Sequence, residues 1–427
     1  METLLQLSPP DLTDLSAIPE PSARNLAVHL TAAGERSAKR RHPWIFDQAI
    51  SQQSHEGAPG DIAVVFDSRR QFLAAGIYDP TSTIRIRLLQ FKKPEAINQD
   101  WFTTKFSSAL KAREPLIALP QEQLTTGYRV VNGENEGLPG LIIDRYDQTL
   151  VCKLYTPAWV PHFPAICRSL YQAIPCERLV LRLSRSLINQ PEHLYGLEDK
   201  MRVWGPPLSG PVFFFENGIQ FEADPFQGQK TGFFLDQREN RARVEKISRG
   251  KSVLNIFSYT GGFSVYAARG GAKRVVSVDL SAPACKAAER NMALNRNFPA
   301  VAAAQHETIA ADAFTVLTEM KSQGRQFDVV IIDPPMFAQN QSQVDAALAA
   351  YRKLTHLGLG VLKPGGILVQ ASCTARIDEE MFFENLHLAA NQAQRPLQEI
   401  ERSAHAIDHP VGYREGKYLK CFFAKVA

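Results

Sequence analysis

The sequence predicts an α/β protein whose largest domain is a Rossmann-like, doubly wound parallel sheet. Three observations lead to this fold class. In the second half of the chain, short apolar runs alternate with longer stretches of helical spacing, as they do in strand–helix–strand units. Upstream of these, Gly and Pro residues separate short β-type runs. With 427 residues, the chain also exceeds what one ordinary core holds, so several domains are expected.

The expected elements define four segments. Residues 1–24 are acidic and Pro-rich, and we expect a disordered tail. Residues 25–93 contain four β-type runs, which predict a small β-barrel or sandwich. Residues 94–205 mix helices and strands and predict a central α+β domain. Residues 206–427 hold the Rossmann-like domain, whose expected buried strands are Val253–Phe257, Val275–Asp279, Val329–Asp333 and Ile367–Ser372.

The composition is that of an ordinary globular protein, with 44% hydrophobic and 22% charged residues. No apolar run reaches the length of a membrane span, and the N-terminus lacks the basic start and apolar core of a secretory signal. The six cysteines are scattered, and none forms a Cys-x-x-Cys pair. We therefore expect reduced thiols, no metal site and a cytoplasmic location.

The net charge of +4 is only mildly basic, but basic residues cluster in the first hundred positions. Arg40 and Arg41 lie in one run, and Arg85 and Arg87 alternate with apolar residues in an expected strand. That alternation should bury the apolar face and expose both arginines on the other. We predict that these four arginines contact nucleic-acid phosphates, although a solvated charged face has the same pattern.

The turn after the first parallel strand carries the pattern of a cofactor site. Its glycines would let a ligand approach the backbone, and the sequence lacks both G-x-G-x-x-G and a P-loop, so a phosphate cradle is poorly supported. Asp279 ends the next strand, where an acid binds ribose hydroxyls, and Asp312 follows the third and can reach an adenine amino group. The set predicts a nucleoside without phosphates, S-adenosylmethionine. The predicted contacts in the turn are Phe257, Tyr259, Thr260, Gly261 and Gly262.

Two reactive groups follow the later parallel strands. Asp333 stands before Pro334 and Pro335, which stiffen the loop, and in adenosylmethionine enzymes such a loop contacts the target base. Cys373 ends the next strand. A thiolate that adds to C6 of cytosine makes C5 nucleophilic, and Asp333 can hydrogen-bond the base and border the cofactor. The alternative is that Cys373 is a small core residue.

A polar, Gly-punctuated segment at residues 228–241 precedes the Rossmann-like strands. We predict a lid over cofactor and base, with Phe234 and Asp236 at the cofactor and Lys230 at the nucleic acid. The alternative is a capped helix entry in which Asp236 begins the helix.

These motifs together resemble the RlmI-type 23S ribosomal RNA cytosine-C5 methyltransferases. The resemblance extends over nearly the whole chain after the first two dozen residues. It rests on Gln229–Arg241, Phe257–Phe263, Asp333–Phe337 and Ser372–Thr374, and further on Arg41–Phe46, Glu134–Tyr146, Asp408–Pro410 and Gly416–Lys420.

The resemblance implies an N-terminal RNA-binding PUA domain, a central α+β domain and a class I methyltransferase domain that uses S-adenosylmethionine. It also implies Cys373 as the nucleophile, a 23S ribosomal RNA cytosine as the target and a homodimer. Two departures stand out. Met336 occupies a position where the family commonly has Lys, and Pro335 occupies the place of a second cysteine used by other RNA cytosine methyltransferases.

Three other functions compete with this one. A guanine-N7 methyltransferase would keep the cofactor site but would need no thiol, so Cys373 would be structural. The second is a non-catalytic RNA-binding ribosome-assembly factor. The presence of the cofactor residues Gly261, Gly262 and Asp279 argues against it, because such a factor would not need them. A nicotinamide-dependent oxidoreductase is disfavoured because G-x-G-x-x-G is missing and the Asp-Pro-Pro loop is present.

Overall fold

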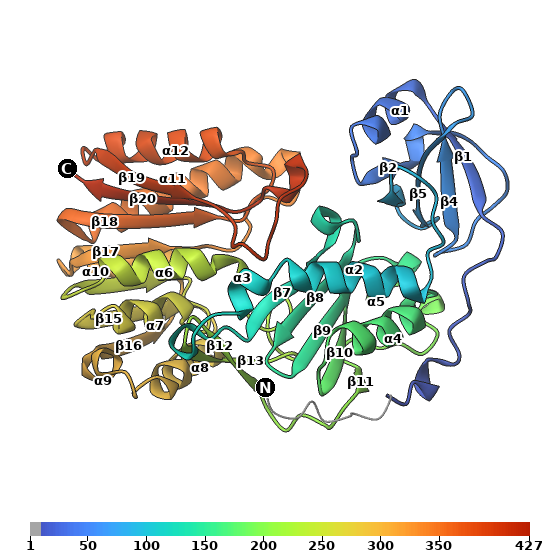
Figure 1. Cartoon of the computed structure of the whole chain (residues 1–427). Helices are drawn as coiled ribbons and strands as arrows, with labels where there is room; N and C mark the ends of the chain where they lie inside the picture. Colours follow the sequence, from blue (N-terminus) through green and yellow to red (C-terminus); the bar gives the residue numbers. More distant parts are fainter. Residues whose placement is uncertain (1–9) are drawn as a thin grey trace. The chain divides into compact units, whose positions relative to one another are not determined.

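The computed structural model describes residues 10–427, and its elements form two compact units that are not contiguous in sequence. The first unit holds the described residues up to Phe214, together with residues 223–233 and 407–413. The second holds residues 215–222, 234–406 and 414–427. Figure 1 colours the chain from blue to red, and the seven-stranded sheet of the second unit lies in its yellow to red part. None of the described helices is long and apolar enough to cross a membrane.

The N-terminal sheet of the first unit has six strands in the order β2-β6-β5-β4-β1-β3. The strands are β1 (Leu26–Leu30), β2 (Trp44–Phe46), β3 (Ile50–Gln53), β4 (Ile62–Phe66), β5 (Phe72–Tyr78) and β6 (Ile84–Gln90). Helix α1 (Ala32–Lys39) begins where the Thr31 hydroxyl accepts a hydrogen bond from Gly34 N. The alternating apolar residues of these strands enclose one core, as the sequence predicted for a small β domain.

The central sheet of the first unit has the order β11-β10-β9-β8-β7. Its strands are β7 (Gly127–Asn132), β8 (Leu141–Tyr146), β9 (Thr149–Leu154), β10 (Arg178–Leu183) and β11 (Arg202–Trp204). Its helices are α2 (Gln99–Lys111), α3 (Glu114–Ile117), α4 (Phe163–Ala173) and α5 (Arg185–Ile188). Helix α4 connects the parallel strands β9 and β10 and lies beside α2, as Figure 1 shows. The apolar faces of these elements form the core of this module.

A two-stranded hairpin follows the central sheet and was not predicted from the sequence. Strands β12 (Val212–Glu216) and β13 (Ile219–Ala223) are joined by Asn217 and Gly218, whose φ angles of 49° and 77° are both positive. Asn-Gly is the preferred pair for such a turn, because both positions need a left-handed backbone. This dipeptide is therefore the sequence signal from which the hairpin could have been predicted.

The second unit confirms the Rossmann-like prediction with a seven-stranded sheet in the order β16-β15-β14-β17-β18-β20-β19. Its strands are β14 (Ser252–Ile256), β15 (Arg274–Asp279), β16 (Gln305–Ala310), β17 (Phe327–Ile332), β18 (Leu362–Ser372), β19 (Leu397–Ser403) and β20 (Lys420–Val426). The first five are parallel to one another, and β20 is antiparallel to both β18 and β19. The chain order reverses between β14 and β17, which is where ligands bind in such sheets.

Helices cover both faces of this sheet. They are α6 (Arg238–Ile247), α7 (Gly262–Arg269), α8 (Ala282–Leu294), α9 (Pro299–Ala303), α10 (Ala313–Ser322), α11 (Val344–Gly360) and α12 (Glu379–Gln392). Val276 packs with residues of α10, whereas its neighbour Ser277 bonds Ser264 of α7. Successive side chains of a strand point to opposite faces, so α7 and α10 lie on opposite sides of β15.

The structure describes residues 10–24 of the segment that we expected to be a disordered tail. Residues 1–9 are not described, but Thr13–Leu15 form a short 3-10 helix, and Leu15 and Ile18 are buried in the core of the central module. The prediction of disorder is therefore wrong for this stretch, since Leu15 and Ile18 are buried in that core and Leu12 packs against it.

Candidate active site

The cofactor turn between β14 and α7 is held in an unusual backbone conformation. Phe257 and Tyr259 have φ angles of 61° and 45°, and Gly261 has 79°. Left-handed angles at aromatic residues are costly and persist only where neighbouring contacts impose them. Here Ser258 N donates to Val278 O at 2.9 Å, and Tyr259 N donates to Asp279 Oδ2 at 2.8 Å. The end of β15 thus shapes the turn.

Glycine is required at position 261 for a second reason besides its φ angle. A Cβ placed there would lie 2.7 Å from the Cβ of Ala288 on α8, closer than real side chains approach. Helix α8 is held against the turn, because Asn291 Nδ2 donates to Thr260 O at 2.9 Å. The absence of a side chain at Gly261 therefore allows helix α8 to pack closely against the turn.

The polar groups of the turn fit a nucleoside ligand. The buried hydroxyls of Ser258 and Thr260 have no hydrogen-bond partner among the described residues, and buried polar groups are rarely left in that state. Asp279 lies half-buried at the carboxyl end of β15, where its carboxylate also accepts from Ser281 N at 2.9 Å. The residues that would hold S-adenosylmethionine are therefore this turn and Asp279, and the bound group would supply an activated methyl.

Asp312 and Asp236 have structural partners that sequence reasoning did not assign. Asp312 is exposed at the start of α10, where its Oδ1 accepts from Thr315 N at 2.9 Å, so it caps the helix. Asp236 is buried, and its Oδ2 accepts from Tyr418 OH at 2.9 Å. Asp236 lies in the short 3-10 helix Leu235–Gln237 that leads into α6, but the N-cap of α6 itself is Gln237.

The predicted lid, residues 228–241, divides between the two units after Phe233. Its first part is tied to the central sheet, because Thr231 Oγ1 donates to Asp144 Oδ2 at 2.5 Å and Phe233 N donates to Tyr146 OH at 3.1 Å. Within the second unit, Phe234 stacks edge-on against Tyr259 with 5.2 Å between ring centroids. The Phe234 ring therefore borders the cofactor turn, and its contact with the cofactor stays a prediction.

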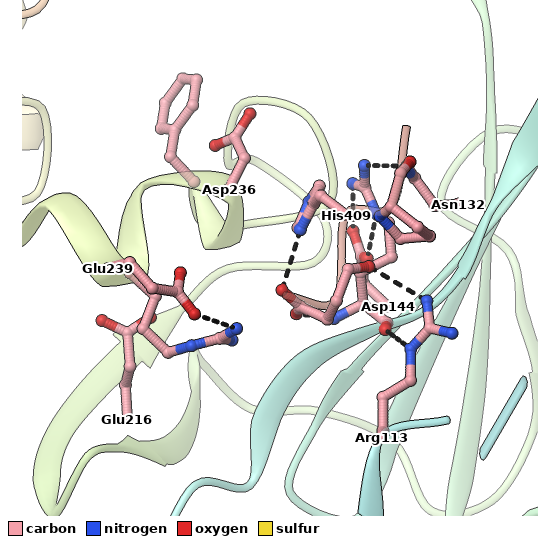
Figure 2. Close-up of polar contacts among 12 residues, drawn as sticks. Arg113, Asn132, Asp144, Glu216, Asp236, Glu239 and His409 are labelled. Atoms are coloured by element: carbon pink, nitrogen blue, oxygen red, sulfur yellow. Dashed lines mark hydrogen bonds and ion pairs between the residues drawn. The ribbon is translucent and has the colours of Figure 1, made fainter. Parts of the chain in front are cut away.

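A buried polar network fixes the central sheet around Asp144. Arg129 forms a two-pronged ion pair with Asp144, with distances of 2.8 and 3.0 Å. Arg113 Nη2 donates to the main-chain oxygen of Asp408 at 3.0 Å, and Asn132 Nδ2 donates to Pro410 O at 3.0 Å. Figure 2 shows Arg113, Asn132 and Asp144 with the segment that carries His409. This part of the family-like motif at 408–410 thus anchors the chain to the first unit.

The two predicted reactive residues lie at the carboxyl edge of two neighbouring strands. Strands β17 and β18 are parallel and pair up to Ile332 and Gln370, so the residues that follow them, Asp333 and Cys373, come to the same edge. Cys373 Sγ lies 4.0 Å from the main-chain oxygen of Pro334. The sequence placed the thiol beside the Asp-Pro-Pro loop, and the structure does bring the two together.

The six cysteines differ in exposure, and this difference singles out Cys373. Five are buried, and Cys373 alone is partly exposed. Burial raises the pKa of Cys176 to about 11, and it raises the pKa of Cys152 and Cys421 further still. A thiol must be reached and deprotonated to act as a nucleophile, so only Cys373 has the required position.

Two buried residues support the segment around Cys373, and neither was assigned a role from the sequence. Tyr351 OH donates to Ser372 Oγ at 2.9 Å and lies 3.1 Å from Thr374 Oγ1. Burial raises the pKa of Tyr351 to about 12, so its hydroxyl stays protonated. Lys420 Nζ donates to the main-chain oxygens of Thr374 and Ile377. Lys420 directly precedes the apolar run 421–424, and this position was the signal that could have identified it.

The predicted nucleic-acid contacts divide into exposed and buried residues. Arg40 and Arg41 are exposed directly after α1, and Lys230 is half-buried in a left-handed turn with φ of 54°. Arg85 is half-buried, and its guanidinium donates to the main-chain oxygen of Pro80. These four positions leave the prediction standing.

The prediction of an exposed Arg87 is wrong. Its side chain is buried, and Arg87 Nη1 lies 3.3 Å from Asp79 Oδ2, which also accepts from Thr156 Oγ1 at 2.5 Å. Burial lowers the pKa of Arg87, and Asp79 opposes this shift. The face of β6 that should have been exposed is covered by the central module, which contributes Thr156. The alternating pattern could not reveal this second covering layer.

Fold and site together define an S-adenosylmethionine-dependent methyltransferase. The family model described as S-adenosylmethionine-dependent methyltransferase matches residues 137–410, and that of the PUA-like domain matches residues 28–91. The chain belongs to the family of the proteins named ribosomal RNA large subunit methyltransferase I, which it resembles over nearly its whole length.

Two relatives illustrate the extent of the match. "Ribosomal RNA large subunit methyltransferase" of Deinococcus radiodurans is 44% identical over 409 residues, which cover 96% of this chain and 99% of the relative. "Ribosomal RNA large subunit methyltransferase I" of Vibrio parahaemolyticus is 40% identical over 94% of this chain and 99% of the relative.

Solved structures of methyltransferases share the fold. A SAM-dependent methyltransferase from Streptococcus mutans superposes with a TM-score of 0.79 at 22% identity, covering 94% of this chain and all of the other. A second, described as complexed with SAH, has a TM-score of 0.78 at 23% identity, with 94% of this chain and all of the other covered.

Proposed function

We propose that this protein methylates C5 of a cytosine in 23S ribosomal RNA through a covalent bond between Cys373 Sγ and C6 of the base. The observation that carries the proposal is the position of Cys373. It is the partly exposed thiol among six, and it lies beside the Asp333-Pro334-Pro335 loop at the edge where β14 also ends in the cofactor turn. The names of the relatives supply the class of RNA.

The thiol is required because C5 of cytosine is a weak nucleophile. When the Cys373 thiolate adds to C6, a C–S bond forms and the electron pair of the C5–C6 double bond becomes available at C5. C5 then takes the methyl group that bound S-adenosylmethionine would supply. The methyl–sulfur bond breaks, and its electron pair stays on the sulfur, which leaves as a neutral thioether. A base afterwards removes the C5 proton, the C5–C6 double bond re-forms, and the thiolate leaves unchanged.

Asp333 is suited to hold the base during these steps. Its main-chain N–H donates to Ile256 O at 3.4 Å, which ties the start of the Asp-Pro-Pro loop to the end of β14. We assign its carboxylate to the exocyclic amino group of cytosine, from which it would accept a hydrogen bond. A fixed acceptor there orients C6 toward Cys373, and such positioning contributes strongly to rate.

The RNA surface in this proposal consists of Arg40, Arg41, Arg85 and Lys230. These residues belong to the first unit and present basic groups that are exposed or half-buried. Contacts of this kind neutralise phosphates and position the RNA without reading its sequence. Arg87 is left out because its guanidinium is buried on Asp79.

A trapping assay tests the chemistry. The protein is incubated with S-adenosylmethionine and ribosomal RNA that contains 5-fluorocytosine, and denaturing gels are searched for a protein–RNA adduct. Fluorine at C5 blocks the final proton removal, so the covalent intermediate should accumulate. We expect the adduct with the wild-type protein and none with Cys373→Ala.

The matched control is Cys176→Ala, which removes a buried thiol of the central module and should still give the adduct. An absence of adduct on RNA that the protein demonstrably methylates would contradict the proposal. So would methylation that survives in Cys373→Ala. Either result would favour a guanine-N7 reaction, in which Cys373 serves packing alone.

A further inference from the structure

Lys420 is a fully buried lysine, which is rare unless the ammonium group has a specific partner. It is paired with Ser372 in the antiparallel ladder of β18 and β20. Cys373 is the residue that follows Ser372 in the chain. Among the described residues it takes part in no ion pair within 4.0 Å. Burial lowers the pKa of Lys420 from 10.5 to about 8, so the group remains mostly protonated at neutral pH.

The amino group of Lys420 holds the loop that carries Cys373. It donates to Thr374 O at 2.7 Å and to Ile377 O at 2.5 Å, which closes the loop between the end of β18 and the start of α12. Both acceptors are neutral carbonyls, so the positive charge is not cancelled by a hydrogen-bonded carboxylate. Among the charged groups around Lys420, a thiolate at Cys373 would favour the protonated lysine most strongly.

Several charged groups surround this pair. Asp378 and Glu379 at the start of α12 also favour the protonated form of Lys420, and Lys417 opposes it. Glu379 itself is engaged in an ion pair with Lys417. Asp333 follows β17 at the same edge of the sheet, and the negative charge of its carboxylate would disfavour a thiolate. A nucleophilic sulfur at this edge therefore needs a nearby cation, and Lys420 is placed to supply it.

We propose that Lys420 is a positioning residue that fixes the Cys373 loop and provides a positive charge which raises the thiolate fraction of the Cys373 sulfur at neutral pH. The inference rests on the proposed thiol chemistry for its purpose. The proposed effect of the Lys420 charge on the ionisation of Cys373 requires neither RNA nor cofactor, so it is tested in the protein alone.

The test is the pH dependence of Cys373 alkylation by iodoacetamide, measured by peptide mass spectrometry on the full chain. Only the thiolate reacts, so the rate reports the deprotonated fraction. In the wild type, the midpoint should lie below about 8.5, the value of an ordinary cysteine. In Lys420→Met, it should rise by about one pH unit, so that the rate at pH 7 falls about tenfold. Above about pH 9.5 the two rates should converge, because hydroxide then deprotonates the thiol without the lysine.

Two controls separate charge from structure. Lys425→Met removes an exposed lysine from the same strand and should leave the profile unchanged. Lys420→Arg keeps the charge and should restore much of the wild-type midpoint. A Lys420→Met profile identical to that of the wild type would overturn the proposal. If that variant does not fold, a wild-type midpoint at or above about 8.5 would overturn it equally.

The two experiments fail independently. A lowered Cys373 midpoint without an RNA adduct would contradict the cytosine-C5 chemistry and leave the charge pair intact. An RNA adduct together with an ordinary midpoint for Cys373 alkylation would support the cytosine-C5 chemistry and contradict the proposed role of Lys420.

Discussion

Individual residues of the cofactor turn carry backbone strain that the fold imposes. Phe257 and Tyr259 adopt left-handed angles although neither is glycine, and Asp279 holds the second of them by accepting from its main-chain N–H. Gly261 needs its left-handed angle and also has no room for a side chain. Strain of this kind is typical of ligand sites, where the surrounding structure offsets its cost.

The turn predicts the behaviour of Gly261→Ala. We expect this variant to lose cofactor binding, since the added Cβ must displace Ala288 or the turn itself. A ligand at about a hundredfold its dissociation constant stabilises a protein by about 2.7 kcal/mol. The rise in melting temperature that S-adenosylmethionine produces in the wild type should therefore disappear in the variant.

Gly324→Ala is the matched control for this prediction. Gly324 also has a positive φ, of 67°, but an added Cβ there would meet nothing within 4 Å. It should lower the melting temperature through strain alone and keep the response to the cofactor. A wild-type response in Gly261→Ala would show that the turn does not approach the ligand.

At the scale of elements, the parallel strands and their helices were predictable because their apolar runs are buried on both faces. The expected Val275–Asp279 differs from β15 by one residue, and Val329–Asp333 overlaps β17. The edge strand β19 was not predicted, since most of its residues are exposed and polar and give no burial pattern. Helix α6 begins with polar residues that are nevertheless buried, because Arg241 is neutralised by Glu216 at 2.6 Å.

The site followed the same logic. Cys373 and Asp333 were predictable because residues that end neighbouring parallel strands meet at one edge. Lys420 was not assigned, since it lies on an antiparallel strand whose position next to β18 no local pattern reveals. Asp312 was predicted as an adenine contact, and the helix cap that it also forms is the ordinary role of Asp at that position.

Two variants of Asp312 separate these roles. Asp312→Ala removes the cap of α10 and should destabilise the cofactor-free protein by about 1 kcal/mol. Asp312→Ser keeps a capping oxygen but shortens the side chain, so stability should stay close to that of the wild type. If the carboxylate reaches the adenine, both variants should bind S-adenosylmethionine more weakly in calorimetric titrations. Wild-type affinity in Asp312→Ser would reduce Asp312 to a cap.

At the scale of the whole molecule, each compact unit is assembled from separate stretches of chain. Residues 407–413 belong to the first unit although strands of the second flank them in sequence. They are anchored there because Arg129 N donates to Asp408 Oδ2 at 2.8 Å and Gly412 N donates to Asn135 Oδ1 at 2.7 Å. The domain boundaries at residues 93 and 205 stay predictions. A segment such as 407–413, which joins a unit far from it in sequence, leaves no local pattern from which the sequence could predict it.

The exposed arginines Arg40 and Arg41 predict a salt-dependent contribution to RNA binding. Reversing the charge of Arg40 and Arg41 to Glu should weaken binding and make its salt dependence shallower. The log–log slope should fall by about 0.7–0.9 for each phosphate that the protein no longer neutralises. Both residues are exposed, so the melting temperature should hardly change. Binding isotherms at several salt concentrations measure this slope.

Arg87 should behave in the opposite way, and the comparison tests the burial that overturned its predicted role. Arg87→Met leaves Asp79 buried without its ion-pair partner, which typically costs about 3–5 kcal/mol. Its melting temperature should fall, whereas the salt dependence of RNA binding by the folded protein should match that of the wild type. Arg87→Lys keeps a charge beside Asp79 and should recover part of the stability. A shallower salt slope in Arg87→Met would mean that this guanidinium reaches the RNA after all, and the covering of β6 by the central module would then have to open when RNA binds.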